Sequence, residues 1–406
     1  MAATSLKGQL PDIPKGLIAT SAALAEVCEH LRAAGTFAFD TEFIGENTYH
    51  PILCLIQVAT AQRVEMIDPL AIPRAQMLPF WELLADERLE KICHAGDQDA
   101  EIAWIESGLA PRNMFDTQIG AGMLGISYPT ALWRAVEYFT GVTLEKGHTY
   151  SAWNRRPLSR EQFSYAVDDV RYLPWIHAEM VAKLQELGHL AWMHSACEEM
   201  VAESTHLVDA RKLFLKVRGA GSLSPLQLSA LRELAALREQ IAFEHDLPAR
   251  FFFKDDVLVD IAQRMPRSVE DLARIKEIPP EELGTYGETI VDAVRRGAAV
   301  PADQRPSILI PGEDSAEEKR KGETLWVAAQ VICLGQSVTP GLVTSQNEIM
   351  TLARLVHDEK PIDKHPLMRG WHRECLGEKL AAFIRGEVEV DLTMREGQLT
   401  AGFRKA

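Results

Sequence analysis

Cysteine is scarce in this sequence, and its spacing shows no pattern. The six cysteines are scattered over 406 residues without a Cys-x-x-Cys pair. A disulfide scaffold or a zinc ribbon needs closer, patterned spacing, so the sequence argues against both. We therefore expect free thiols in a reducing compartment.

Long apolar runs are also missing. No run approaches the ~20 residues that a transmembrane helix needs. The first residues, from Met1 to Lys7, lack the apolar stretch of a signal peptide. The sequence thus predicts a cytoplasmic protein that does not associate with a membrane.

Basic residues are fewer than acidic ones, 43 against 58, which gives a net charge of −15. A protein that coats nucleic acid needs a basic surface, so that class is disfavoured. Residues 1–200 carry −11 of the total. Carboxylates gathered around divalent cations would account for this local charge, so a nuclease is not excluded.

The order of patterns predicts an α/β half followed by a helical half. Short apolar runs that predict strands occupy residues 36–39, 53–58, 64–67 and 91–94, the first three as an antiparallel meander. Helical patterns cover residues 98–107, 130–139 and 159–173. This predicts a mixed sheet with helices on both faces. Beyond about residue 205 the pattern is all-helical, and Ser224 is expected to cap a helix that begins at Pro225.

Composition shifts divide the chain into four expected segments. A first domain covers residues 1–205 and is long enough to fold alone. A helical domain follows over residues 206–300. Residues 301–319, rich in proline and charge, are expected to form a linker, and residues 320–406 a second helical domain.

Two carboxylates lie at the end of the first long strand. Asp40 and Glu42 are two residues apart, so they point to the same face, about 7 Å apart along the chain. Oxygen ligands at this spacing suit shared coordination of hard cations. Alone, the pair is also typical of solvated charges at a strand end.

Two further acidic motifs follow. Asp99 is expected in the first turn of a helix, where the helix dipole favours an anion, with Asp97 as the N-cap. His94 is interpreted as structural. Tyr165 and Asp169 are four residues apart on one helix and share a face, so the tyrosine hydroxyl could orient water beside the carboxylate.

Together these residues resemble the three exonuclease motifs of the DEDD superfamily, in order and in context. The resemblance covers residues 20–190 and is strongest to the ribonuclease D family, with tyrosine in the third motif. It is carried by the four acids with Tyr165 and by the flanking segments Thr48-Tyr49-His50-Pro51, Leu55-Ile56-Gln57, His94-Ala95-Gly96, Phe115-Asp116-Thr117-Gln118 and Arg156-Pro157-Leu158. Ala152 departs from the family pattern, which often has an acid there.

The resemblance implies a ribonuclease H-like DEDD exonuclease domain with a mixed sheet flanked by helices, followed by two all-α HRDC-like domains. It also implies hydrolysis of phosphodiester bonds with two divalent ions, Mg²⁺ or Mn²⁺. Asp40 would bridge both ions, Glu42 and Asp169 would complete the first site, and Asp99 would hold the second. Tyr165, with Glu42, would position the attacking water.

Other polar residues near the motifs have two interpretations each. Asp116 is either an N-cap or a group that supports the site. Arg155, Arg156 and Arg160 form either a solvated loop or contacts to substrate phosphate. We expect Thr41, Arg155 and Arg156 to contact the substrate.

The predicted function is a 3′-5′ exoribonuclease that releases 5′-mononucleotides, with RNA, above all tRNA precursors, as partner and no obligate protein partner. Residues 206–300 resemble an HRDC domain, and residues 322–390 resemble the more divergent second one. The basic segment 211–218 is either a solvated face or a strip that guides RNA. The alternatives are a DNA 3′-5′ exonuclease on the same fold and a non-catalytic nucleic-acid-binding protein.

Overall fold

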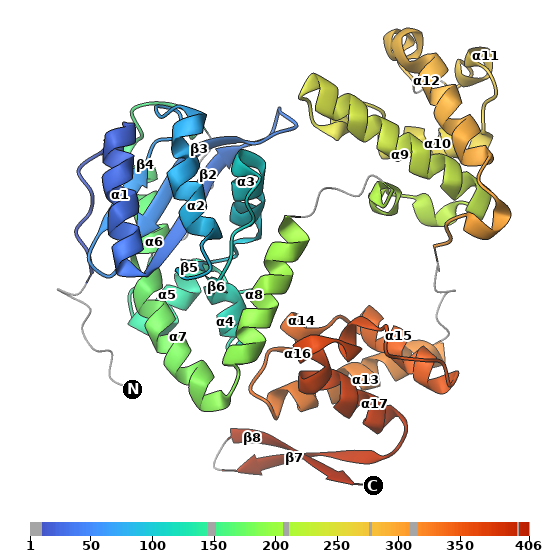
Figure 1. The fold of residues 1–406 in the computed structure, drawn as a ribbon. Helices are drawn as coiled ribbons and strands as arrows, with labels where there is room; N and C mark the ends of the chain where they lie inside the picture. The colour runs from blue at the N-terminus through green and yellow to red at the C-terminus, as the bar shows by residue number, and fades with distance from the viewer. Residues whose placement is uncertain are drawn as a thin grey trace. The chain divides into compact units, whose positions relative to one another are not determined.

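A computed structural model describes residues 10–144, 152–205, 211–275, 278–308, 316–395 and 398–405 (Figure 1). The chain forms two compact units, and each is discontinuous in sequence. Unit 1 comprises Met1–Phe43, Leu53–Thr205 and Asp314–Ala406, and unit 2 comprises Ile44–Ile52 and His206–Glu313.

A six-stranded mixed sheet lies at the centre of unit 1, with the strand order β1-β4-β3-β2-β5-β6. Strand β3 is antiparallel to β4, with Ile56 opposite Ile67, whereas β2 is parallel to β5, with Ala38 opposite Ile92. The strands span Leu17–Ile18 (β1), Thr36–Ile44 (β2), Ile52–Ala59 (β3), Val64–Ile67 (β4), Glu90–Cys93 (β5) and Met114–Asp116 (β6). The predicted mixed sheet is confirmed. The short edge strands β1 and β6 were not expected, because two or three residues carry no periodic signal.

Helices flank this sheet (Figure 1). Helices α6, α7 and α8 contact strands β4, β5 and β6, while α2 contacts both α1 and α3. The helices span Ser21–Ala34 (α1), Leu78–Ala85 (α2), Asp97–Ser107 (α3), Thr117–Met123 (α4), Leu132–Thr140 (α5), Arg160–Arg171 (α6), Leu173–Leu187 (α7) and Leu190–Ser204 (α8). The three helical patterns expected in this half correspond to α3, α5 and α6.

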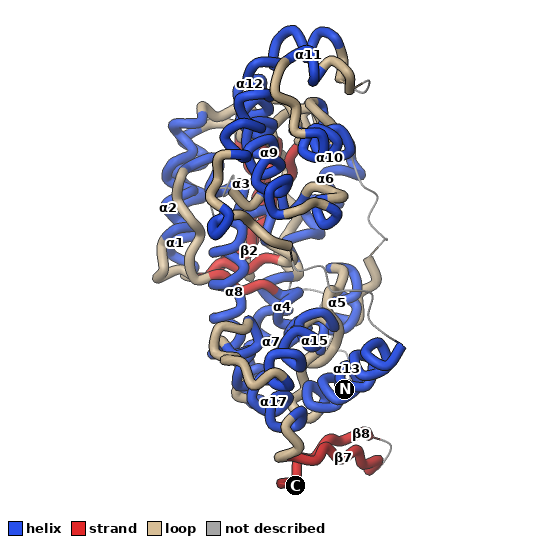
Figure 2. The backbone as a smooth tube through the Cα atoms, turned by 90° about the vertical axis from the view of Figure 1, so that its right-hand side faces the viewer, coloured by secondary structure: helices blue, strands red, loops and turns tan. Residues whose placement is uncertain are grey.

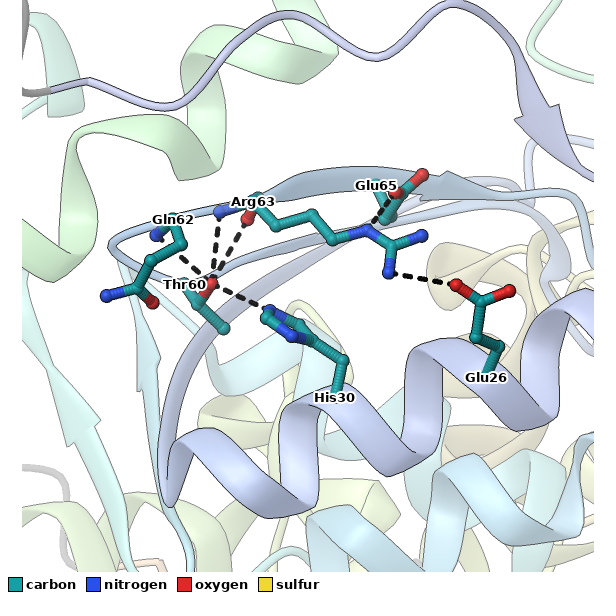
Figure 3. Close-up of polar contacts among 6 residues, drawn as sticks. All are labelled: Glu26, His30, Thr60, Gln62, Arg63 and Glu65. Carbon is teal, nitrogen blue, oxygen red and sulfur yellow. Dashed lines mark hydrogen bonds and ion pairs between the residues drawn. The ribbon is translucent and has the colours of Figure 1, made fainter.

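A polar network ties the β3–β4 turn to helix α1 (Figure 3). The Thr60 hydroxyl accepts hydrogen bonds from two backbone N–H groups of the turn and lies 3.0 Å from Nε2 of His30. Arg63 pairs with Glu65 beside it and with Glu26 of α1. The network therefore holds one end of the β3–β4 hairpin against the helix that covers it.

The C-terminal part of unit 1 is helical and ends in a β-hairpin. Its helices span Ala316–Leu334 (α13), Pro340–Val343 (α14), Gln346–His357 (α15), Gly370–His372 (α16) and Glu378–Ile384 (α17), with a π-helical turn at Arg373–Gly377. Strands Val388–Arg395 (β7) and Gln398–Lys405 (β8) form a separate two-stranded antiparallel sheet (Figure 2). The hairpin was not expected, although the alternation of Val388, Val390, Leu392 and Met394 with polar residues is a strand signal.

These C-terminal helices share one hydrophobic core with the sheet-bearing part of unit 1. Buried residues such as Ile332 and Leu376 belong to the same cluster as Met180 and Cys197. Helix α14 contacts α4, and α16 contacts α8. The carboxylate of Glu199 on α8 also accepts a hydrogen bond from Nε1 of Trp371, at 3.2 Å. The shared core argues against the expectation that residues 1–205 fold alone.

Unit 2 is an all-helical body with a core of its own. The predicted cap is confirmed, because Ser224 and Gln227 form a capping box ahead of Pro225. Helices α9 and α12 approach closely, since a Cβ on Gly297 would lie 2.4 Å from the Cα of Ala230. The helices span Pro225–His245 (α9), Asp255–Arg264 (α10), Val269–Leu272 (α11) and Pro280–Ala298 (α12).

Short 3₁₀ segments connect the longer elements at Arg74–Met77, Leu213–Lys216, Ala220–Ser222, Ala249–Phe251, Ala302–Gln304 and Pro366–Met368. Within the described part of the chain, no helix combines the length and the apolar character that crossing a membrane requires.

The shared core makes a prediction about truncation. A chain that ends after Thr205 would leave the faces of α4 and α8 that contact the C-terminal helices open to water, and exposed apolar area costs about 25 cal/mol per Å². We expect this chain to aggregate or to unfold at a clearly lower temperature than the full-length protein in a thermal melt. A chain that lacks only residues 388–406 keeps the C-terminal helices and should lose much less. Equal melting temperatures for the full-length protein and the chain ending at Thr205 would contradict the shared core.

Candidate active site

Three carboxylates from two elements meet at one place in unit 1. Asp40 and Glu42 lie on β2, and Asp169 lies on α6. Each offers a ligand oxygen, and these oxygens all lie within 4.8 Å of one another. All three side chains are partly exposed, so the cluster can be reached from solvent. Alternation along β2 places Asp40 and Glu42 on the same face, as expected from their spacing.

Asp99 lies next to this cluster, in the first turn of α3, as expected. Its side chain is buried, and its Oδ1 accepts a hydrogen bond of 2.5 Å from the hydroxyl of Thr41. This hydrogen bond places Asp99 beside β2, because Thr41 lies between Asp40 and Glu42 in that strand. The structure therefore brings all four predicted acids together.

Tyr165 faces the cluster from α6, one helical turn before Asp169. Its hydroxyl is hydrogen bonded to the Asp169 carboxylate. Burial, with the nearby charges of Asp169, Glu42 and Asp40, raises the pKa of the phenol well above its usual value. The hydroxyl consequently stays protonated near neutral pH. It can orient a water molecule, but it cannot serve as a base.

The pKa values of the four carboxyl groups are all raised. Burial is the largest cause in each case, followed for Asp40 by repulsion from Asp99, Asp169 and Glu42. The pKa of Glu42 rises to about 8, that of Asp169 to about 8 and that of Asp99 to about 7. Carboxylates packed this closely are stable in their ionised form only with a cation among them. An all-oxygen donor set suits Mg²⁺ or Mn²⁺.

Asp116 fills both of the roles considered for it. Its Oδ1 accepts hydrogen bonds from the N–H groups of Gln118 and Ile119 and so caps α4. The same carboxylate accepts from the N–H groups of Ala95, at 3.1 Å, and Gly96, at 2.8 Å. These residues immediately precede α3, so Asp116 fixes the start of the helix that carries Asp99.

The expected N-cap of α3 is wrong. Gly96 occupies that position, and Asp97 is the first helical residue. Asp116, from β6, accepts hydrogen bonds from the backbone N–H groups of Ala95 and Gly96 and so fixes the two residues before the helix, while α3 has no side-chain cap. His94 is structural, as expected, because Nδ1 lies 2.9 Å from the Thr117 hydroxyl and Nε2 lies 2.8 Å from the Thr130 carbonyl.

Arg156 does not have the geometry expected of a phosphate ligand. Its five N–H groups donate to both carboxylate oxygens of Asp68, at 2.7 Å each, and to the carbonyls of Trp153, Arg155 and Cys54. The guanidinium therefore pins the loop before α6 to the sheet. For Arg155, contact with substrate phosphate stays a prediction, whereas the Thr41 hydroxyl is engaged with Asp99.

Sequence reasoning missed two buried polar groups. Asp68 is the partner of Arg156, and nothing local in the sequence distinguishes it from a turn residue. Lys91 is fully buried in β5, where Nζ donates to the carbonyls of Asp86 and Leu89, and burial lowers its pKa to about 8. The sequence signal that could have revealed this buried amine is the presence of a lysine in a short apolar strand.

The fold and the acidic site define a 3′-5′ exonuclease. A family described as "3'-5' exonuclease" matches residues 17–185, and the HRDC domain family matches residues 227–294. The ribonuclease D of Nitrobacter hamburgensis is 32% identical over 92% of this chain and 96% of its own length. That of Gluconacetobacter diazotrophicus is 32% identical over 96% of both chains.

A solved structure resembles the whole chain as well. The crystal structure of Escherichia coli RNase D, described as an exoribonuclease involved in structured RNA processing, has a TM-score of 0.79 and 29% identity, covering 92% of this chain and 99% of its own. The chain belongs to the ribonuclease D family, and it is a 3′-5′ exoribonuclease.

The raised pKa values predict how stability depends on pH without metal. A carboxyl group whose pKa rises on folding favours the native state while protonated. That contribution is complete below the unfolded value of about 4 and is lost as pH rises through the folded values of about 8 for Glu42 and Asp169. We expect the melting temperature of the metal-free protein to fall between pH 5.5 and pH 8. Added Mn²⁺ should raise it more at pH 8, because cations compete with protons for the oxygens.

Glu42→Gln provides the control for this measurement. It removes one of the repelling charges while keeping the size of the side chain, so the metal-free variant should show a shallower fall in melting temperature with pH. An unchanged slope in the variant, or an equal Mn²⁺ effect at both pH values, would contradict the proposed repulsion.

Proposed function

We propose that this enzyme shortens RNA from its 3′ end in a metal-dependent reaction, releasing 5′-mononucleotides, and that it acts in tRNA 3′-end maturation. The observation that carries the proposal is the group of ligand oxygens of Asp40, Glu42 and Asp169 within 4.8 Å of one another, with Asp99 beside them. Four carboxylates without cysteine or histidine ligands favour hard divalent cations.

The proposal gives each of the four acids a role. As the resemblance to the exonuclease motifs implies, Asp40 would contribute to the binding of both ions. Glu42 and Asp169 would complete one ion site, and Asp99 would hold the second. The ions, when bound, would activate a water molecule and stabilise the departing 3′-oxygen.

The uncharged hydroxyls of Tyr165 and Thr41 would orient neighbouring groups, namely the attacking water and the Asp99 carboxylate. The protonated hydroxyl of Tyr165 borders Asp169, so it would orient the attacking water beside that carboxylate. The Thr41 hydroxyl holds one oxygen of Asp99, which fixes the direction in which the other oxygen points. Both groups limit the freedom of a cluster that repulsion would otherwise spread apart.

The choice of RNA rests on the family and on the architecture. The relative from Escherichia coli is described as involved in structured RNA processing, and unit 2 contains the HRDC match over residues 227–294. A helical nucleic-acid-binding module in the same chain as an exonuclease domain suits a folded substrate with a single-stranded 3′ end, such as a tRNA precursor. Arg155, in the loop before α6, is the proposed phosphate contact.

A digestion experiment tests the proposal. The full-length protein is incubated with a 3′-extended tRNA, a single-stranded RNA and a DNA of matched sequence, each with Mg²⁺, Mn²⁺ or EDTA. We expect stepwise shortening of both RNAs, weak action on DNA and no activity in EDTA. Asp40→Asn should lower the rate by at least about a hundred-fold, or about 2.7 kcal/mol of barrier. Full activity in chelator, or a preference for DNA, would refute the proposal.

Tyr165→Phe separates water orientation from metal binding. The substitution keeps the ring and removes the hydroxyl that borders Asp169. We expect kcat to fall about a hundred-fold, as is typical of positioned catalytic groups, while the Mn²⁺ concentration that gives half-maximal activity hardly changes. Weaker Mn²⁺ binding with normal kcat at saturating metal would instead assign the hydroxyl to the metal site.

A further inference from the structure

The turn that leads from β5 into α3 is held by groups outside that helix. Helix α3 has no side-chain cap of its own, and Asp97 is its first residue. Asp99 lies in the first turn, so the place of its carboxylate follows from where the helix starts and in which direction it leaves the turn. The groups that hold the turn therefore bear on the acidic site.

The carboxylate of Asp116 is the main support of this turn. The residue is 2% exposed, and its two oxygens accept hydrogen bonds from four backbone N–H groups. Oδ1 accepts from Ala95, Gln118 and Ile119, at 3.1, 2.7 and 3.3 Å. Oδ2 accepts from Gly96, at 2.8 Å. One buried side chain thus ties the two residues before α3 to the first turn of α4.

The backbone of the turn has a conformation that needs such support. Ala95 has a φ of +57°, in the left-handed region that disfavours residues with a side chain. Backbone of this kind persists where the surrounding structure imposes it. Gly96 approaches β5 so closely that a Cβ there would lie 2.4 Å from Sγ of Cys93. Asp116 binds the N–H groups of both turn residues and so holds the strained turn against the sheet.

The junction between β6 and α4, formed by Asp116 and Thr117, is itself fixed on two sides. The Thr117 hydroxyl donates to the carbonyl of Cys93 and lies 2.9 Å from Nδ1 of His94. The backbone N–H of Asp116 donates to Sγ of Cys197 on α8, at 3.3 Å. All of these residues belong to unit 1, as do the four acids. The junction therefore connects α8 to the start of the helix that carries Asp99.

We propose that Asp116 is a positioning residue for Asp99: by holding Ala95 and Gly96, it sets the start of α3 and thereby the affinity for the metal ion that Asp99 binds. The inference rests on the proposed function, in which Asp99 holds the second ion. Groups that orient a metal ligand from behind raise the affinity for the metal, because they limit the motion of the ligand. A role in stability alone would lower the melting temperature and leave metal affinity unchanged.

Two substitutions of Asp116 separate position from charge. Asp116→Asn keeps the size of the side chain, but its NH₂ group must face at least one backbone N–H, and two donors cannot bond each other. Asp116→Glu keeps the charge, but the added methylene at a buried position moves the carboxylate away from its four N–H partners. We expect both variants to show the same defect, because both disturb the turn before α3.

Mn²⁺ binding to the full-length protein is measured by electron paramagnetic resonance, with a diribonucleotide analogue in which a methylene group replaces the departing 3′-oxygen. The wild type should bind two ions. Both variants should bind the second ion about ten-fold more weakly, at the lower end of the range for groups that orient metal ligands. On a hydrolysable diribonucleotide, the Mn²⁺ concentration for half-maximal rate should rise by the same factor, while kcat recovers at saturating Mn²⁺.

Two further variants act as controls, and thermal melts report the stability of each protein. Thr20→Ala removes the side-chain cap of α1, a helix that carries none of the acids. It should lower the melting temperature and leave Mn²⁺ binding unchanged; an equal weakening would assign the effect to stability. Thr117→Val removes the hydroxyl that holds the same turn at His94. It should also weaken the second ion, and it tests the inference even where the Asp116 variants do not fold.

Normal affinity for the second Mn²⁺ in Asp116→Asn and Asp116→Glu would overturn the inference alone. A defect in Asp116→Asn with normal binding in Asp116→Glu would also overturn it, because the charge of Asp116 would then matter and not its position. A wild-type protein that binds a single Mn²⁺ would refute the two-ion arrangement, and the inference with it. Two bound ions without RNA hydrolysis would refute the proposed function, and the binding measurements would still decide the inference.

Discussion

Mutual repulsion among carboxylates at the end of β2 is the constraint around which unit 1 is organised. Asp40, Glu42 and Asp169 share a space in which their oxygens lie within 4.8 Å, and burial strengthens their repulsion because the local dielectric is low. With Asp99 beside them, three separate elements must be held in place against a force that separates them. The sheet, with α3 and α6 against it, supplies that rigidity, and divalent cations would supply the missing charge.

The acids of unit 1 fall into two groups according to what balances them. Asp116 accepts four backbone N–H groups, and Asp68 is paired with Arg156, so both are stabilised by the protein itself. Glu42 and Asp169 have raised pKa values whose causes include only burial and other acids, apart from the hydroxyl of Tyr165. Asp116 and Asp68 therefore stabilise the fold of unit 1, whereas the charges of Glu42 and Asp169 would be balanced by bound cations. This division distinguishes structural from functional acids better than burial does.

Each of the two units is built from segments that are far apart in the sequence. The C-terminal helices contact α4 and α8 and complete the core of unit 1, although residues 206–313, which belong to unit 2, precede them in the chain. The β2–β3 connection in turn belongs to unit 2 and packs on α9 through Tyr49 and His50. The C-terminal helices therefore contribute to the integrity of the sheet-bearing region through apolar packing.

The sequence by itself determined the four acids, Tyr165, the mixed sheet and the helical tail, because strand alternation, helical spacing and motif order are local properties of the chain. It could not assign Arg156, whose partner Asp68 lies 88 residues away, nor the start of α3, because the residues before that helix are held by Asp116 on another strand. The membership of residues 314–406 in the catalytic unit and the anchoring of Tyr49 on α9 were likewise decided only by the tertiary structure. The physical reason is common to all of these: a buried polar group or apolar face is satisfied by whichever partner folding brings near, and sequence distance does not limit that choice.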